Sequence, residues 1–418
     1  MKIKINSNVI LSGLITIIIL VDNCFFNLFK SKFIDFFMGT QNKRLVSVLV
    51  LVTAFFYVVI KKEKSFYQEI SKFACKYICA LIFFVLIEIV YTSLFFDLQP
   101  VYTTINQSLP FFIILLYFPL IRKLVNDRGT KKIFNILNIV ALINYLLAFM
   151  QAYIYMESGH IFLNYDFIWI RNGRPRIGFG VWGGIMIIYN FYQGFFGKDF
   201  RKKTIKYIFI FLFGIIVLFL YQQTRAMTMA IILSMTTICL FGKKNMNKII
   251  KSVAFIFIGS IFILGTGYIN RVVDSIFELT SESTYNRTYA IEHYAQIFEK
   301  YPFFGTGFTT EEHYFSMIRG SLGIAYIDDV GIIGIATSLG MVGVFFVVVF
   351  VLRLSYIAYR LSLYRDPDAS LFWACVVYLF ATMPTLIIFN PQRIILVPIL
   401  LSIFEYKYFE HNSICQDK

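Results

Sequence analysis

The chain has 418 residues, of which 58% are hydrophobic and 15% charged, and its mean hydropathy is +0.70. A soluble domain is about 25% charged, and here the apolar residues fall in blocks of roughly twenty, the length that crosses a hydrocarbon core of about 30 Å. This composition excludes a soluble globular protein. Because backbone groups in a bilayer must be bonded within the protein, it predicts an all-α integral membrane protein.

The apolar blocks predict about twelve transmembrane helices in a single polytopic domain that covers residues 1–418. The first block follows Lys2 and Lys4 as in a signal peptide, but no cleavage site of small residues comes after it, so we expect a retained helix. In chain order the predicted spans are 9–29, 45–60, 73–96, 101–121, 133–156, 177–196, 205–221, 225–241, 249–267, 326–352, 370–389 and 392–408.

The formal net charge of +15 would suggest a nucleic-acid partner in a soluble protein. About two thirds of the 39 Lys and Arg residues, however, lie in segments that are cytoplasmic if the N-terminus is inside. The positive-inside rule therefore predicts that both termini are cytoplasmic, and no nucleic-acid partner is expected. The exception is the first outer loop, which carries Lys30, Lys32, Lys43 and Arg44.

The longest segment between predicted spans covers residues 268–325 and is polar and aromatic, so we expect a large extracytoplasmic loop. A loop of this length in a compact protein is usually functional. Within it, 286–300 is predicted to form a short amphipathic helix on the membrane surface, which Pro302 ends. Around this helix the candidate site residues are Tyr285, Arg287, His293, Glu311 and His313.

Asp328 and Asp329 lie directly before the helix of the tenth span. They are candidate site carboxylates, although acids at such a position also cap helices. The pair keeps a bound divalent metal possible, although no HExxH metal motif occurs. No P-loop or dinucleotide fingerprint occurs either, and no cytoplasmic loop is long enough for a nucleotide-binding domain, so we expect no cofactor.

Arginines on the predicted outer side need a physical reason. Arg171, Arg174 and Arg176 lie in a loop whose Gly and Pro residues make the backbone irregular, so their guanidinium groups could converge on one anion. Anchoring at lipid headgroups is the alternative. Arg225 lies between two apolar spans, where it either faces an aqueous cavity or anchors a helix end.

Two further features lie within spans. Glu88 is in the outer half of the third span, where it could balance an outer Arg or bond a neighbouring helix. The tenth span carries a series of glycines, which predict tight helix packing rather than a ligand site: Gly331, Gly334, Gly340 and Gly343.

Arginine, candidate bases and aromatic residues thus gather on one side of the bilayer. Arginine suits phosphate better than lysine because its donors form a planar fork, and aromatic faces suit sugar rings. A lipid-linked diphosphate that carries a glycan is compatible with both features.

Four motifs resemble the Wzy-type polysaccharide polymerases and the related O-antigen ligases, which form the O-antigen ligase-like superfamily. They are Arg-Pro-Arg-Ile-Gly-Phe-Gly ending at Gly180, the step Thr224-Arg225, the run from Asn286-Arg287 to Gly305-x-Gly307-Phe308, and Asp328-Asp329-Val-Gly-Ile-Ile-Gly334 followed by Leu339-Gly-Met-Val-Gly343. The likeness covers roughly residues 165–345 and the overall number of spans.

This resemblance implies a GT-C-like glycosyltransferase in the cytoplasmic membrane of a bacterial cell. It would join undecaprenyl-diphosphate-linked oligosaccharide repeat units into an O-antigen, capsule or exopolysaccharide at the outer face of the membrane. Expected partners are these lipid-linked units, membrane lipid, and a chain-length regulator and flippase of the same pathway. Activity without a metal is expected, because arginines can take its place.

The resemblance also assigns site residues. Arg225 and Arg287 match the arginine motifs and are expected to be catalytic. The ligases place a histidine directly before the tenth helix, where this chain has Asp328-Asp329, with His313 farther upstream; this departure favours the polymerases. The base stays open between His313, Asp329 and Glu311. Substrate binding is expected from Arg171, Arg174, Arg176, Glu88, Glu311, Asp328 and Tyr285.

Other functions are open at this stage. An O-antigen-type ligase would transfer finished polysaccharide to another acceptor. A flippase or secondary transporter would also fit the number of spans, but no inverted repeat is evident, and the polar residues lie outside rather than at the midplane. A structural scaffold is disfavoured because arginines at the membrane edge are costly.

Overall fold

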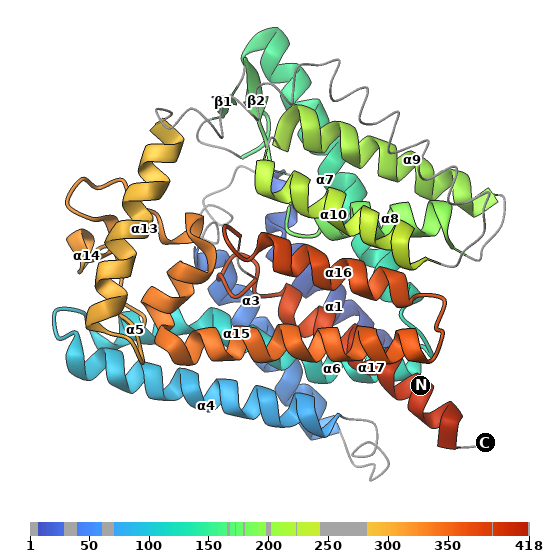
Figure 1. The fold of residues 1–418 in the computed structure, drawn as a ribbon, viewed down its shortest axis with the longest axis horizontal. Helices are drawn as coiled ribbons and strands as arrows, with labels where there is room; N and C mark the ends of the chain where they lie inside the picture. Colours follow the sequence, from blue (N-terminus) through green and yellow to red (C-terminus); the bar gives the residue numbers. More distant parts are fainter. Residues whose placement is uncertain are drawn as a thin grey trace, which may run out of the picture.

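The computed structural model describes residues 7–28, 40–60, 71–164, 168–171, 173–178, 180–197, 202–222, 224–242, 282–386 and 388–416. The regular secondary structure of these residues is helical, apart from one two-stranded hairpin (Figure 1). The N-terminal elements are α1 (Ser7–Asp22), η1 (Cys24–Asn27), α3 (Thr40–Ile60), α4 (Lys72–Phe95), α5 (Val101–Ser108), η3 (Leu109–Leu116), α6 (Tyr117–Asn126) and α7 (Lys131–Ser158).

The antiparallel strands β1 (Trp169–Arg171) and β2 (Arg174–Arg176) come next in the chain. They are followed by α8 (Gly183–Phe195), α9 (Lys202–Val217), the π-helical turn η4 (Leu218–Gln222), α10 (Arg225–Phe241), α13 (Glu282–Lys300), α14 (Phe315–Arg319), η5 (Ile327–Asp329), α15 (Gly331–Leu363), α16 (Ala369–Thr382) and α17 (Leu396–Gln416).

Five helical segments are long and apolar enough to cross a membrane: Lys72–Phe95, Val101–Asn126, Lys131–Ser158, Thr204–Gln222 and Gly331–Leu363. Three shorter apolar helices accompany them, at Ile10–Asp22, Ala226–Phe241 and Ala369–Thr382. The described residues thus support a polytopic membrane protein. The number of about twelve spans stays a prediction, and both the ninth span at 249–267 and the first part of the loop at 268–325 lie outside the described residues.

The helices form two groups that meet at α16. Figure 1 shows α7, α8, α9 and α10 together with the β1–β2 hairpin on one side of the molecule, and α4, α15 and α17 on the other. Helix α16 packs against α10 in the first group and against α15 in the second. The boundary between the groups is therefore lined by residues that are far apart in the sequence.

Helix α15 is broken at Gly340, which has φ +62°. The segment 302–307 bonds to the helix at this break: Met341 N donates to Pro302 O at 2.8 Å, and the carbonyls of Thr337 and Ser338 accept from the backbone of 306 and 307 at 2.8 and 2.7 Å. A Cβ atom at Gly340 would lie 2.0 Å from Phe303 O. The lack of a side chain at Gly340 therefore lets a loop segment approach the helix backbone. The glycine series in the sequence predicts instead that a neighbouring helix packs there.

Helix α13 spans Glu282–Lys300, which confirms the helix predicted over 286–300 and its end before Pro302. Its apolar face packs onto the start of α15 in a small separate cluster that includes Tyr294 and Val330. Whether this helix lies on a membrane surface stays a prediction.

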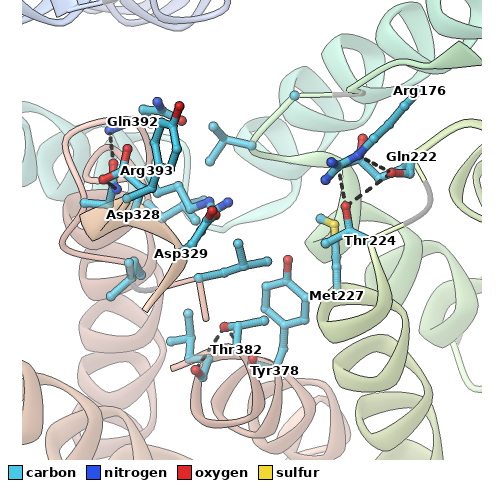
Figure 2. Close-up of a pocket in the computed structure, with 18 residues that line it drawn as sticks. Arg176, Gln222, Thr224, Met227, Asp328, Asp329, Tyr378, Thr382, Gln392 and Arg393 are labelled. Carbon is cyan, nitrogen blue, oxygen red and sulfur yellow. Dashed lines mark hydrogen bonds between the residues drawn. The ribbon is translucent and has the colours of Figure 1, made fainter. Parts of the chain in front are cut away.

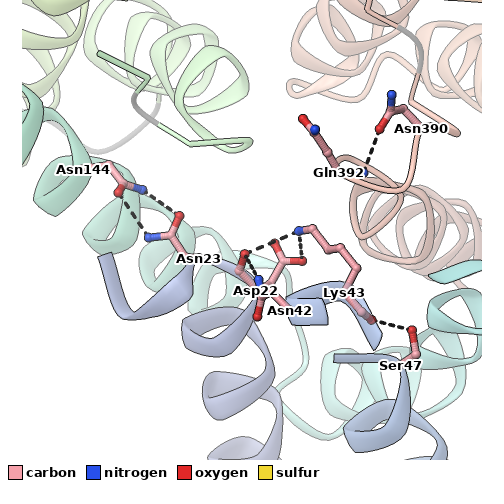
Figure 3. Close-up of polar contacts among 8 residues, drawn as sticks. All are labelled: Asp22, Asn23, Asn42, Lys43, Ser47, Asn144, Asn390 and Gln392. Carbon is pink, nitrogen blue, oxygen red and sulfur yellow. Dashed lines mark hydrogen bonds and ion pairs between the residues drawn. The ribbon is translucent and has the colours of Figure 1, made fainter. Parts of the chain in front are cut away.

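A buried ion pair joins the first two helices. Lys43 Nζ lies 2.6 Å from Asp22 Oδ1, and the exposed fractions of the two side chains are 9% and 2%. Asn42 donates to the backbone carbonyl of Asp22, and Asn23 and Asn144 exchange two hydrogen bonds beside it (Figure 3). The charge of Lys43, which is an exception to the positive-inside rule, is thus neutralised by a buried ion pair.

Candidate functional site

A cavity of about 480 Å³ opens where the two groups of helices meet. Its polar lining comes from the end of β2, the step before α10, the turn before α15, the end of α16 and the turn before α17 (Figure 2). The residues concerned are Arg176, Gln222, Thr224, Tyr326, Asp328, Asp329, Tyr378, Thr382, Asn390, Gln392 and Arg393.

Arg176 forms one wall of this cavity. Because side chains alternate along a strand, β2 buries Pro175 and exposes Arg174 and Arg176. Arg176 Nε donates to Gln222 O at 3.4 Å, and Gln222 Nε2 donates to Thr224 Oγ1 at 3.1 Å. Thr224 is the N-cap residue of α10, so the partial positive charge at this helix end adds to the guanidinium on the same wall.

The opposite wall holds two carboxylates, Asp328 and Asp329, at the end of η5. Neither caps α15, because the N-cap position is Val330. Instead Asn390 Nδ2 donates to Asp328 Oδ1, and Gln392 N donates to Asn390 Oδ1 at 2.8 Å. The turn between α16 and α17 thereby fixes the position of Asp328.

Asp328 is open to the cavity but surrounded by protein. This burial raises the pKa of Asp328, and Asp329 raises it further, while the hydrogen bond from Asn390 and the charges of Arg393 and Arg319 offset only part of the increase. A carboxylate with a raised pKa is a better proton acceptor than an ordinary one.

Arg393 lies on the same wall and interacts electrostatically with Asp328 and Asp329. Figure 2 shows Arg176 pointing toward Asp329 and Arg393 from the other side of the cavity. Arg393 is not among the site residues predicted from the sequence, where it falls at the start of the span predicted at 392–408. The cost of placing an arginine between two apolar spans, which singled out Arg225, would have singled out Arg393 as well.

A cavity with guanidinium groups and carboxylates can bind a diphosphate and accept a proton next to it. Residues 209–348 match a family model described as O-antigen ligase. This match supports the O-antigen ligase-like superfamily, whose members are glycosyltransferase-like membrane enzymes of polysaccharide assembly. No curated protein matches the sequence.

The O-antigen ligase match covers Thr224, Asp328 and Asp329 but ends before Arg393 and begins after Arg176. The arginines that the structure describes in the cavity therefore come from outside the matched segment. The match does not distinguish a ligase from a polymerase.

The remaining predicted arginines are placed differently. Arg225 begins α10 directly after Thr224, so its backbone lies at the edge of the cavity; its side chain, like that of Arg171, is outside the described residues. Arg174 is exposed and lies near Tyr221 rather than in the cavity lining. Arg287 and Tyr285 are exposed on α13, and neither belongs to the lining.

His313 and Glu311 also lie apart from the cavity lining. His313 Nδ1 is 3.0 Å from Thr310 Oγ1, and Glu311 Oε2 is 2.7 Å from Arg319 Nη2. The guanidinium of Arg319 lies 3.9 Å above the ring of Tyr326, which does line the cavity. In this arrangement the loop residues support the cavity wall.

Glu88 is fully buried in α4, and no hydrogen-bond partner for its carboxylate occurs among the described residues. It lies beneath the turn at 304–308, where the neighbouring Thr92 Oγ1 accepts a hydrogen bond from Phe308 N at 3.0 Å. The structure therefore places Glu88 behind the loop and outside the cavity lining.

Proposed function

We propose that the chain is a polysaccharide polymerase of the bacterial cytoplasmic membrane. It would join undecaprenyl-diphosphate-linked repeat units at the outer face, with both termini in the cytoplasm. The observation that carries the proposal is one cavity in which Arg176, on one wall, faces Asp328, Asp329 and Arg393 on the other, from distant segments of the chain. The O-antigen ligase match over 209–348 supports the same class of chemistry.

In the proposed reaction, a hydroxyl of the incoming unit attacks the anomeric carbon of the growing chain. The new glycosidic bond forms as the bond to the lipid diphosphate breaks, and the diphosphate leaves with the electron pair. The hydroxyl proton passes to a carboxylate of the cavity. Negative charge on the leaving group grows in the transition state, so preorganised Arg176 and Arg393 would stabilise it by about 3–4 kcal/mol for each well-placed donor. Arg225 is proposed to contribute as well, from the family resemblance.

The test of this proposal replaces Arg176 or Arg393 by lysine. Lysine keeps the charge but loses the planar fork, so we expect polymer formation to fall roughly 10²–10³-fold, almost as far as with alanine. Purified protein in nanodiscs would be supplied with lipid-linked repeat units extracted from cells that lack this chain, and polymer length would be read on a gel. Near-normal polymer from both lysine variants would rule the proposal out.

Arg174→Ala is the matched control. Arg174 lies on the same strand and the same face as Arg176 but outside the cavity lining. We expect it to keep most of the activity. A loss equal to that of Arg176→Ala would show that the hairpin as a whole, rather than the guanidinium in the cavity, is needed.

The description of the matched family model makes an O-antigen-type ligase the second candidate. Extracts from cells that lack the chain separate the two. Single lipid-linked units would accumulate if a polymerase is missing, and long lipid-linked chains if a ligase is missing. Activity that survives a chelator would exclude a required metal in either case.

A further inference from the structure

A second, smaller cavity of about 200 Å³ lies beside the first. Asp328 and Asn390 line both cavities, so their hydrogen bond forms part of the wall between them. Most of the other lining residues come from α5, η3, the 304–308 turn with Thr309, the first turns of α15 and the turn before α17. They include Gln107, Phe111, Thr306, Phe308, Ser338 and Phe389.

The two cavities differ in charge. The first contains Arg176 and Arg393, whereas no Lys or Arg occurs among the described residues that line the second. The second instead offers aromatic rings, such as Phe111 and Phe308 with centroids 5.5 Å apart, and neutral amide and hydroxyl groups. Rings that pack against a sugar face, with neutral groups that bond its hydroxyls, suit a carbohydrate, while a diphosphate would lack cationic partners there.

The size of the second cavity limits what it can hold. Pockets for drug-sized ligands measure about 300–1,000 Å³, so a cavity of about 200 Å³ fits one sugar ring rather than an oligosaccharide. A terminal sugar would therefore enter alone, with the rest of the repeat unit outside.

We propose that the second cavity is the acceptor subsite, which holds the terminal sugar of the incoming unit with its hydroxyl at Asp328. This assignment rests on the proposed polymerase function. The donor diphosphate occupies the first cavity, and Asp328, which lines both, takes the hydroxyl proton as the acceptor oxygen bonds to the anomeric carbon.

The geometry favours Asp328 over Asp329 for this role, because Asp329 lines the first cavity only. Asn390 donates to Oδ1 of Asp328, which leaves Oδ2 without a protein donor among the described residues. Asn390 is therefore a positioning residue, and Oδ2 is the oxygen that receives the proton.

The test fills the second cavity with Gln107→Trp. Two probes separate the cavities: undecaprenyl diphosphate alone for the first, and the oligosaccharide released from lipid-linked units by mild acid for the second. We expect the variant to bind undecaprenyl diphosphate as the parent protein does. Its affinity for the oligosaccharide should fall about tenfold or more, and its polymer formation should fall by a similar factor. Equal loss of both probes, or no loss of either, would overturn the assignment.

Gln107→Leu keeps the inference testable if the tryptophan variant does not fold. It removes only the amide, so we expect weaker oligosaccharide binding with unchanged undecaprenyl diphosphate binding; unchanged oligosaccharide binding would overturn the assignment.

Asp328→Asn should lower the turnover rate about 10²–10⁴-fold while both probes still bind, and Asp329→Asn should lower it less. The reverse order of these two variants would overturn the role of Asp328.

The two proposals fail in distinguishable ways. If undecaprenyl diphosphate does not bind and no polymer forms with the parent protein, the proposed function itself is wrong. If both occur but filling the second cavity changes nothing, only the acceptor subsite is wrong.

Discussion

The charged side chains that line the first cavity come from segments far apart in the chain. Sequence reasoning identified Arg176, Asp328 and Asp329 because ionisable groups near a membrane need a reason, and the structure brings these three to one cavity. It did not identify Arg393, and it selected Arg287 and Tyr285, which are exposed on α13. Which charges meet depends on how helices far apart in the chain pack, and no local pattern records that.

The pH dependence of turnover tests the role of Asp328. A base works only when ionised, and because the pKa of Asp328 is raised, activity should be lost, as pH falls, at a higher pH than an ordinary aspartate would cause. Asn390→Leu removes a hydrogen bond that lowers this pKa, so the acidic limb of the pH–rate profile should move to still higher pH. A limb that stays in place or moves to lower pH would contradict a proton-accepting Asp328.

The buried pair of Lys43 and Asp22 should matter for stability. Lys43→Met leaves the Asp22 carboxylate without its ion-pair partner in a site where its side chain is 2% exposed, which should cost about 3–5 kcal/mol. Thermal unfolding in nanodiscs would measure this cost, and the double variant with Asp22→Asn should recover much of it.

Lys132→Met is the control for this pair. Lys132 also lies 2.6 Å from a carboxylate, that of Asp127, but its side chain is 66% exposed. Solvent screens such a pair, so its loss should change the stability by about 1 kcal/mol or less. If the two methionine variants were equally stable, burial would not be what makes the Lys43 pair important.

Individual helices lie close to their predicted positions where runs of apolar residues define them. The span predicted at 225–241 is α10, Arg225–Phe241, and that at 133–156 is α7, Lys131–Ser158. The irregular loop predicted around Arg174 is instead a β-hairpin with Arg171 paired to Arg174. Strands of three residues carry no periodic signal, and the sequence clue to the hairpin is the Asn-Gly pair at 172–173, a typical hairpin turn. In the structure Gly173 has a positive φ.

Substitution of Gly340 tests whether the loop at 302–307 depends on the break in α15. In Gly340→Ala the added methyl group would meet Phe303 O at 2.0 Å, and the residue would keep a φ that side chains disfavour. We expect a loss of at least about 1–3 kcal/mol and earlier proteolysis of the 302–307 segment. Gly13→Ala is the control, because nothing lies within 4 Å of its added methyl group and alanine favours helices. Equal effects of both substitutions would mean that the loop does not depend on the break.

At the scale of the whole molecule, the sequence predicted a polytopic helical membrane protein, and five described helical segments are long and apolar enough to cross a membrane. It did not indicate that two groups of helices meet at α16, or that one carboxylate lines two cavities. The family resemblance covered roughly residues 165–345, whereas α5 and η3 line the second cavity and α4 bonds to the 304–308 turn. These features arise from contacts between distant segments, each of which looks ordinary by itself.

The break in α15 has a consequence for the order in which the chain assembles. Lipid offers no hydrogen bonds, so the carbonyls of Thr337 and Ser338 and the amide of Met341 cannot remain in hydrocarbon without partners. The segment 302–307 supplies these partners and precedes α15 in the chain. On the predicted topology, in which this segment is extracytoplasmic, it would have to be translocated before α15 could adopt its final shape in the bilayer. A nascent chain that stalls before this step would then hold an incompletely folded membrane helix.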